Sequence, residues 1–141
     1  MGDYIYLIAP VAGWLVAQGI KFILTLRKDG ITWGDAVQSG GMPSSHTALM
    51  MALTVVVGET QGYISAIFGV TAAVTAIIIY DAMGVRRTTG QQTAAINELA
   101  KRSNTTLKTE ITVSRGHTLS EVIGGVLVGI IVGFSLVALL N

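Results

Sequence analysis

The sequence has no cysteine, few charged residues and only two prolines among its 141 residues. The lack of cysteine excludes a disulfide framework and a thiolate metal site. Charged residues make up 12% of the chain and hydrophobic residues 51%, whereas soluble domains carry roughly 25% charged residues. This composition predicts a protein whose main solvent is lipid, and the length predicts one domain, residues 1–141. A net charge of +1 gives no reason to expect nucleic acid as a partner.

Four apolar segments are candidate membrane spans, because a bilayer core of about 30 Å requires about 20 apolar residues per helix. They cover residues about 4–26, 44–58, 63–83 and 118–140. The first has neither a basic region before it nor a cleavage site of small residues, so we expect a retained span rather than a signal peptide. The second is short, and its start is expected either in the headgroup layer or inside protein. The predicted fold is an all-α integral membrane bundle of about four transmembrane helices.

A polar connection, Gly84 to His117, joins the third and fourth spans. Its part from Gln91 to Arg102 has apolar residues at loosely helical spacing, which predicts a surface helix.

The distribution of positive charge predicts the topology. Four spans put both termini and the Gly58–Gly62 turn on one side of the membrane. All nine lysines and arginines lie on or near the other side: Lys21, Arg27, Lys28, Arg86, Arg87, Lys101, Arg102, Lys108 and Arg115. The positive-inside rule therefore places the Arg27–Met42 and Gly84–His117 connections in the cytoplasm, and the chain in the inner (plasma) membrane as a multi-pass protein.

The fourth span has glycines at four-residue spacing, Gly125, Gly129 and Gly133. Such a stripe predicts close helix packing, either within one chain or between chains, rather than a pore or a hinge. Because four helices form a thin bundle, a homodimer is the oligomer that we expect.

Two histidines, His46 and His117, both lie at predicted cytoplasmic helix starts. A helix start presents unpaired backbone N–H groups and the positive end of the helix dipole, which favour an anion. Two such starts among lysines and arginines predict a phosphate site. Ser44 or Ser45 is an alternative simple helix cap, and Thr118 to Glu121 fits a capping box. Glu121 also lies one turn after His117, where its carboxylate can orient the imidazole.

Further candidates lie near the ends of the first and third spans. Asp81 lies at membrane depth and is a functional candidate, with an ion pair to Arg86, Arg87 or Lys21 as the alternative. Arg86 and Arg87 either bind phosphate or anchor the topology. Lys21 must reach the interface or meet an anion. The two histidines, Asp81 and Glu121 follow no metal-ligand spacing, so neither a metal nor another cofactor is expected.

Three motifs carry a family resemblance. Gly40 to His46 reads Gly-Gly-Met-Pro-Ser-Ser-His, Tyr80 to Arg87 reads Tyr-Asp-Ala-Met-Gly-Val-Arg-Arg, and Gly116 begins Gly-His-Thr-Leu-Ser-Glu-Val. Together they resemble the type 2 phosphatidate phosphatase and vanadium haloperoxidase superfamily, and more closely its divergent bacterial branch. Proteins of that branch are small membrane proteins related to acid phosphatase/vanadium-dependent haloperoxidase. The resemblance extends from about Lys21 to Gly129.

The resemblance implies a mechanism. His117 would attack phosphorus and form a phosphohistidine, while His46 would protonate the leaving oxygen. Glu121 stands where the superfamily usually has aspartate. Phosphate would be bound by side chains matching or replacing the superfamily's: Lys21, Arg27, Ser44, Ser45, Arg86 and Arg87.

The chain also departs from the superfamily pattern. The first motif lacks its Arg-Pro, Ile111 replaces the arginine that lies six residues before the nucleophile, and the superfamily core has six helices.

Three functions are therefore considered. The first is a metal-independent phosphatase acting on a lipid phosphate or diphosphate at the cytoplasmic leaflet. The second is an inactive membrane protein that binds anionic lipid or regulates another protein, which the missing arginine motif favours. The third, a small transporter or channel subunit, ranks last because no proton relay is visible.

Overall fold

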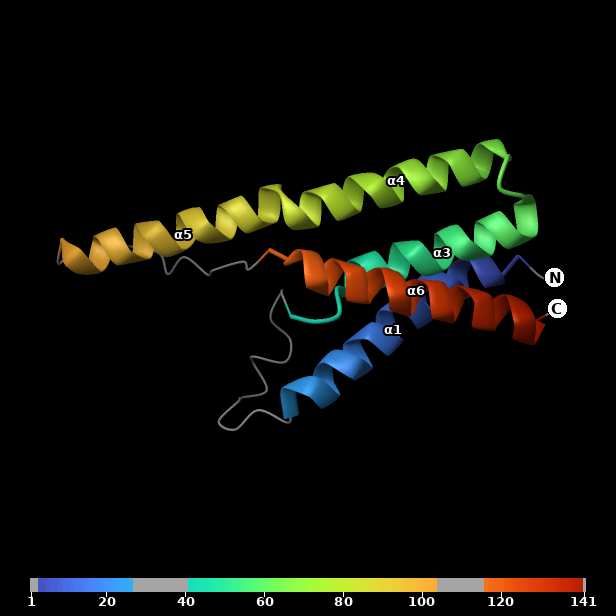
Figure 1. Ribbon diagram of the computed structural model, residues 1–141, viewed down its shortest axis with the longest axis horizontal. Coiled ribbons are helices and arrows are strands. Elements are labelled where there is room, and N and C mark those ends of the chain that lie inside the picture. Colours follow the sequence, from blue (N-terminus) through green and yellow to red (C-terminus); the bar gives the residue numbers. More distant parts are fainter. Residues whose placement is uncertain (1–2, 27–40, 104–115, 141) are drawn as a thin grey trace.

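The computed structural model describes residues 3–26, 41–103 and 116–140, without the side chains of Arg86 and Arg87. These residues form five helices (Figure 1): α1 (Ile5–Leu26), α3 (Ser45–Gln61), α4 (Ala66–Met83), α5 (Val85–Arg102) and α6 (Leu119–Leu140). The described ranges contain no strand. The predicted all-α fold is confirmed.

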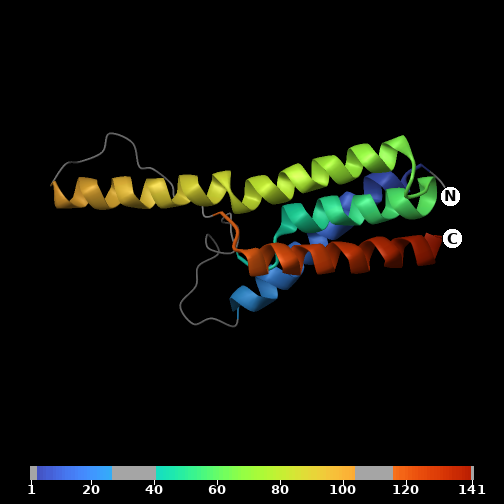
Figure 2. The same cartoon turned by 45° about the horizontal axis from the view of Figure 1, so that its top comes forward.

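Helix α3 lies at the centre of the bundle and packs against α1, α4 and α6. Figures 1 and 2 show both chain ends at the end of the bundle where α3 turns into α4. The Tyr6 hydroxyl of α1 lies 2.9 Å from Thr60 Oγ1 near the end of α3, which ties the two helices together there. This is the arrangement expected for antiparallel spans with both termini on one side.

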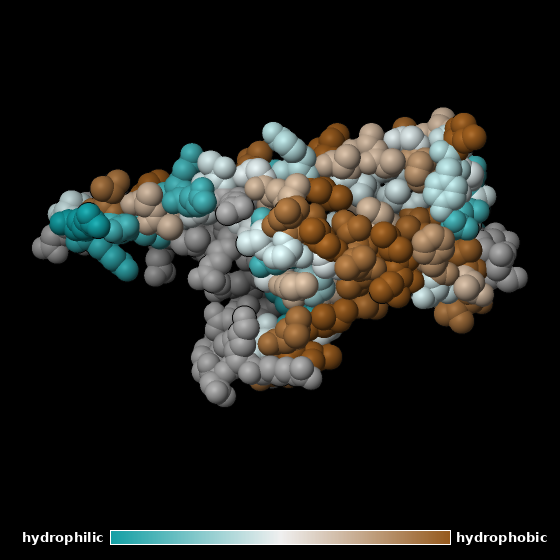
Figure 3. Space-filling model, viewed as in Figure 1, coloured by the Kyte–Doolittle hydropathy of each residue, from teal (hydrophilic) through white to brown (hydrophobic). Residues whose placement is uncertain are grey.

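Three stretches of the described chain are long and apolar enough to cross a membrane: Ile5–Leu26, Ala66–Arg102 and Leu119–Leu140. Their outward side chains are apolar and exposed, for example Leu7, Ile77 and Leu127. Figure 3 shows such hydrophobic atoms over one face of the bundle. Lipid is the solvent that these surfaces require, so the chain is a membrane protein.

Helix α3 is the short candidate span, with 17 residues and a length of about 26 Å. Its first residues are enclosed by protein, because Ser44, Ser45 and Thr47 are all buried. The start of α3 is therefore enclosed by protein, and its depth relative to the headgroup layer stays a prediction. Whether α3 crosses the whole bilayer stays a prediction.

The glycine stripe of α6 packs against α3. A Cβ built on Gly129 would lie 2.7 Å from the carbonyl oxygen of Ala48, and one built on Gly133 would lie 2.7 Å from Val55 Cβ. Helix α1 also packs closely against α3, because a Cβ built on Gly13 of α1 would lie 2.7 Å from the same Ala48 oxygen. The predicted packing role of the stripe is confirmed, and its partner lies within one chain. The homodimer stays a prediction.

Helix α5 differs from the surface helix predicted at Gln91–Arg102. It begins at Val85, directly after Gly84, and Figures 1 and 2 show it continuing the line of α4 beyond the bundle. The predicted start was therefore wrong by six residues. Nucleating a new helix costs free energy, whereas extending an existing one costs little. Because α4 already provides a helical end, the polar residues that follow it, such as Thr88 and Thr89, can extend the helix. Their hydroxyls donate to the carbonyls of Gly84 and Val85.

The close approach of α3 and α6 predicts that Gly129→Ala destabilises the fold. The added methyl would lie 2.6 Å from Met51 Cβ and 2.7 Å from a backbone oxygen, so the helices must separate. Overpacking of this kind costs about 1–3 kcal/mol, measurable by reversible unfolding in detergent micelles. Gly69→Ala on α4 is the matched control, because a Cβ there meets nothing within 4 Å. Equal stability of the two variants would contradict this packing.

Candidate functional site

Backbone hydrogen bonds bring three segments together at one end of the bundle. The Ser44 N–H, just before α3, donates to the Glu121 carbonyl in the first turn of α6 at 2.9 Å. The His117 N–H, just before α6, donates to the Ala82 carbonyl near the end of α4 at 3.0 Å. The starts of α3 and α6 and the end of α4 are therefore held in fixed relation, and each of the three sequence motifs contributes one of these segments.

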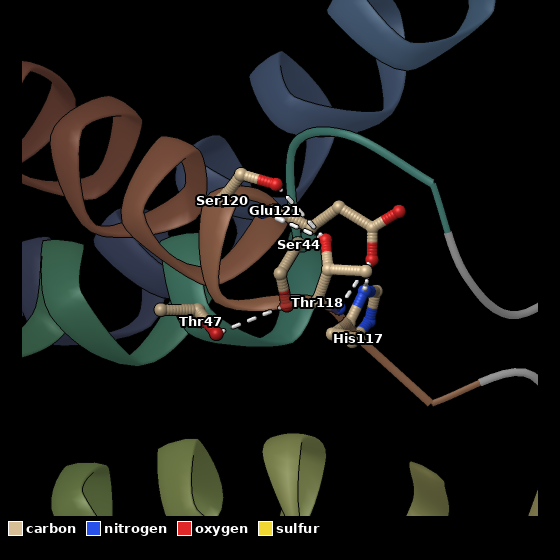
Figure 4. Close-up of polar contacts among 6 residues, drawn as sticks. All are labelled: Ser44, Thr47, His117, Thr118, Ser120 and Glu121. Carbon is tan, nitrogen blue, oxygen red and sulfur yellow. Dashed lines mark hydrogen bonds and ion pairs between the residues drawn. The ribbon is translucent and has the colours of Figure 1, made fainter.

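Glu121 forms the centre of the polar cluster shown in Figure 4. Its Oε2 lies 3.2 Å from His117 Nδ1 and accepts the Thr118 N–H at 2.8 Å. The Glu121 N–H in turn faces Thr118 Oγ1 at 3.4 Å. The predicted capping box at the start of α6 is confirmed, and the same carboxylate oxygen also meets the imidazole.

This contact favours one hydrogen position on the imidazole. A carboxylate beside Nδ1 favours the form of the buried His117 in which Nδ1 carries a hydrogen and donates it. In the neutral ring of that form the lone pair lies on Nε2. The contact with Glu121 thus holds the His117 ring in one orientation.

Ser44 has a different role from the helix cap considered from the sequence. It occupies the N-cap position of α3, but its side chain makes no capping hydrogen bond. Its hydroxyl oxygen instead accepts from the Thr47 hydroxyl at 3.0 Å (Figure 4). Both residues are completely buried beside the start of α6. Ser45 is the first residue of α3 and is also buried.

Lys21 approaches this cluster from α1. Its side chain is buried, and it interacts electrostatically with Glu121. The alkyl chain of Lys21 passes close to Gly41, where a Cβ would lie 3.2 Å from Lys21 Cε. Gly41 also has a positive φ of 88°, which glycine adopts without strain. Because glycine has no side chain, the Lys21 side chain can pass Gly41 toward the starts of α3 and α6.

His46 lies in the first turn of α3, at the same end of the bundle, but its side chain is exposed. Successive residues of an α-helix are separated by about 100° around the axis. Thr47 and Ala48 lie beside the glycines of α6, so this register directs His46 away from that interface. The structure therefore brings the helix starts of the two histidines to the same end of the bundle, with the His117 side chain buried and the His46 side chain exposed.

The other predicted site residues are located only in part. Asp81 is half-buried in the last turn of α4. Arg27 lies outside the described residues, and so do the side chains of Arg86 and Arg87, whose backbone begins α5.

Sequence reasoning missed Thr47, Gly41 and the Ala82 carbonyl as parts of the site. A threonine one turn after a helix cap, and the Gly40-Gly41 pair before Pro43, were the signals available for two of them. A backbone carbonyl leaves no signal in the sequence.

Comparison with known proteins identifies a relative and a family. An uncharacterized membrane protein, YuiD of Bacillus subtilis (strain 168), is 39% identical to the chain over 97 residues. That alignment covers 66% of this chain and 60% of YuiD, so the chain spans about three fifths of that relative. No solved structure matches.

A family model described as "Divergent PAP2 family" matches residues 3–132. This match includes all three sequence motifs and the helices that bring them together. The resemblance inferred from the motifs is therefore confirmed: the chain belongs to the divergent PAP2 family.

Proposed function

We propose that this membrane protein is a phosphatase that hydrolyses a lipid phosphate or diphosphate through a phosphohistidine on His117. The observation that carries the proposal is the contact of 3.2 Å between His117 Nδ1 and Glu121 Oε2. It favours Nε2 as the nucleophilic atom and sets a carboxylate behind the ring. Membership of the PAP2-related family agrees with a phosphatase.

In the proposed first step, Nε2 of His117 attacks phosphorus, and the bond from phosphorus to the leaving oxygen breaks. The imidazole becomes cationic as it gains the phosphoryl group, and the Glu121 carboxylate stabilises that charge. In the second step, water attacks phosphorus, the N–P bond breaks, and His117 returns to its neutral form.

Phosphate charge would be neutralised by groups from several segments. Lys21 brings a buried ammonium from α1 to the Glu121 side of the cluster. The start of α3, whose N-cap side chain makes no capping hydrogen bond, adds the partial positive charge of a helix N-terminus. Ser44, Ser45, Arg27, Arg86 and Arg87 are the further proposed phosphate ligands, with Asp81 as support. Such preorganised charge is the main requirement of phosphoryl transfer.

The leaving oxygen needs a proton, and His46 is the proposed donor. After the first step its neutral imidazole would accept the proton of the attacking water. The His46 side chain is exposed at the start of α3, where solvent can exchange protons with its imidazole.

A lipid substrate follows from the position of the site. The cluster lies where three apolar helices end, so a phosphate bound there can remain attached to an acyl or prenyl tail in the bilayer. The positive charge near this end favours the cytoplasmic leaflet of the plasma membrane.

A second candidate function is an inactive protein that binds anionic lipid. The observation that favours it is the exposure of the His46 side chain, whereas His117 is buried against Glu121. Such a protein would keep the anion pocket and release no phosphate. Measuring phosphate release distinguishes the two functions.

We predict that His117→Ala abolishes phosphate release from lipid phosphates in detergent micelles. His46→Ala should lower the rate about 10²–10⁴-fold, the usual contribution of a general acid. Vanadate should inhibit the unchanged protein in the presence of EDTA, because it imitates five-coordinate phosphorus. Phosphate release that survives both substitutions would reject the proposal, and saturable lipid binding without release would support the inactive protein.

Glu121→Gln is predicted to separate the two roles of this side chain. Glutamine can still accept the Thr118 N–H, so the helix cap and the free energy of unfolding should change little. The negative charge behind His117 is lost, so the rate of phosphate release should fall at least about 100-fold. Glu98→Gln removes the carboxylate of an exposed pair with Arg102 and should leave the rate unchanged. Similar rates for the two variants would exclude an electrostatic role for Glu121.

Lys21→Met is predicted to weaken phosphate binding. Methionine keeps most of the apolar length of lysine but removes the ammonium, so vanadate should inhibit at a concentration at least about 10-fold higher. Lys101→Met, at an exposed position of α5, is the matched control. Vanadate should inhibit it at the same concentration as the unchanged protein. An unaltered vanadate response of Lys21→Met would show that Lys21 takes no part in anion binding.

A further inference from the structure

The combined length of α4 and α5 is greater than a bilayer requires. The continuous stretch Ala66–Arg102 has 37 residues, about 55 Å of helix, whereas the hydrocarbon core is about 30 Å thick. Helix α4 alone, Ala66–Met83, has 18 residues and meets most of that thickness. Helix α5 therefore begins at the membrane surface, at the same end of the bundle as the His117–Glu121 pair.

Helix α5 is amphipathic. Val85, Ile96 and Leu99 lie on one side of it by helical register, and their exposed fractions are 59%, 45% and 66%. Another side of α5 is covered, because Gly90 and Thr93 are buried. The apolar stripe is thus exposed, although Gly90 and Thr93 show that α5 has a covered side. Figure 3 shows isolated hydrophobic atoms on this otherwise hydrophilic arm.

The charge of α5 complements an anionic surface. The helix contains four cations, Arg86, Arg87, Lys101 and Arg102, and one acid, Glu98, so its net charge is 4 − 1 = +3. A second copy of α5 would bring two such helices side by side and their like charges together. An anionic leaflet attracts the cations and receives the apolar stripe as well.

Gly84 joins α4 to α5. Its φ of −96° and ψ of −87° mark the end of α4 and the start of α5. The neighbouring Ala82 carbonyl accepts the His117 N–H. The chain two residues before Gly84 is therefore hydrogen-bonded to the backbone of His117, the proposed nucleophile.

We propose that α5 turns about Gly84 and lies along the surface of an anionic leaflet, with Val85, Ile96 and Leu99 in the acyl boundary. The helix then holds the site against the lipid surface that carries its anionic headgroups. This docking does not require turnover, so it stands or falls separately from the proposed phosphatase activity.

Single-cysteine spin labels test the docking, because the chain has no native cysteine. The Leu99→Cys variant carries a nitroxide on the apolar stripe, and Ala94→Cys carries one at an exposed position on the opposite side. Both full-length proteins are reconstituted in vesicles of phosphatidylcholine with phosphatidylserine, and in phosphatidylcholine alone. Spin relaxation then compares oxygen, which enters the acyl layer, with a water-soluble nickel chelate.

In phosphatidylserine vesicles we expect the Leu99 label to be relaxed several-fold more by oxygen than by nickel, and the Ala94 label to show the reverse. The preference of the Leu99 label for oxygen should weaken in phosphatidylcholine alone and at high salt. Nickel access to both labels in every vesicle would overturn the proposal. Spin–spin broadening of the Leu99 label would assign the stripe to a second copy and would also overturn it.

Discussion

The close approach of α3 and α6 is the constraint on which the site depends. Glycines on α6 let it contact the backbone of α3 at Ala48 and Ala52. Between helices in lipid, packing replaces the hydrophobic effect as the main source of association, so small residues determine how near two helices can come. This packing sets Ser44 against the first turn of α6. The segments that carry the first and third sequence motifs are therefore joined by the same packing that holds the bundle together.

At that junction, one carboxylate contacts both the helix start and a histidine ring. Glu121 caps α6 through the Thr118 N–H and orients His117 through Nδ1. The two hydrogen bonds share one oxygen, so the ring position is coupled to the geometry of the helix start. Such a shared contact holds a side chain in place through backbone geometry.

The sequence was sufficient for the features that depend on local pattern. Apolar length predicted the membrane helices, glycine spacing predicted the packing stripe, and Thr118 to Glu121 predicted the capping box. Features that depend on tertiary contacts were not predictable. The side of α3 on which His46 lies depends on which face α6 occupies, and the start of α5 depends on its continuity with α4. The Ala82–His117 hydrogen bond joins backbone groups, which no side-chain pattern encodes.

The most direct measurement of the central claim is to trap the covalent intermediate. The purified protein would be mixed with a lipid phosphate carrying a radioactive phosphoryl group, quenched in alkali, and cleaved for peptide mapping. A nucleophilic His117 predicts a label that is stable in alkali, is lost in acid and lies on the peptide containing His117. Phosphate release at full rate with no label on that peptide would contradict it.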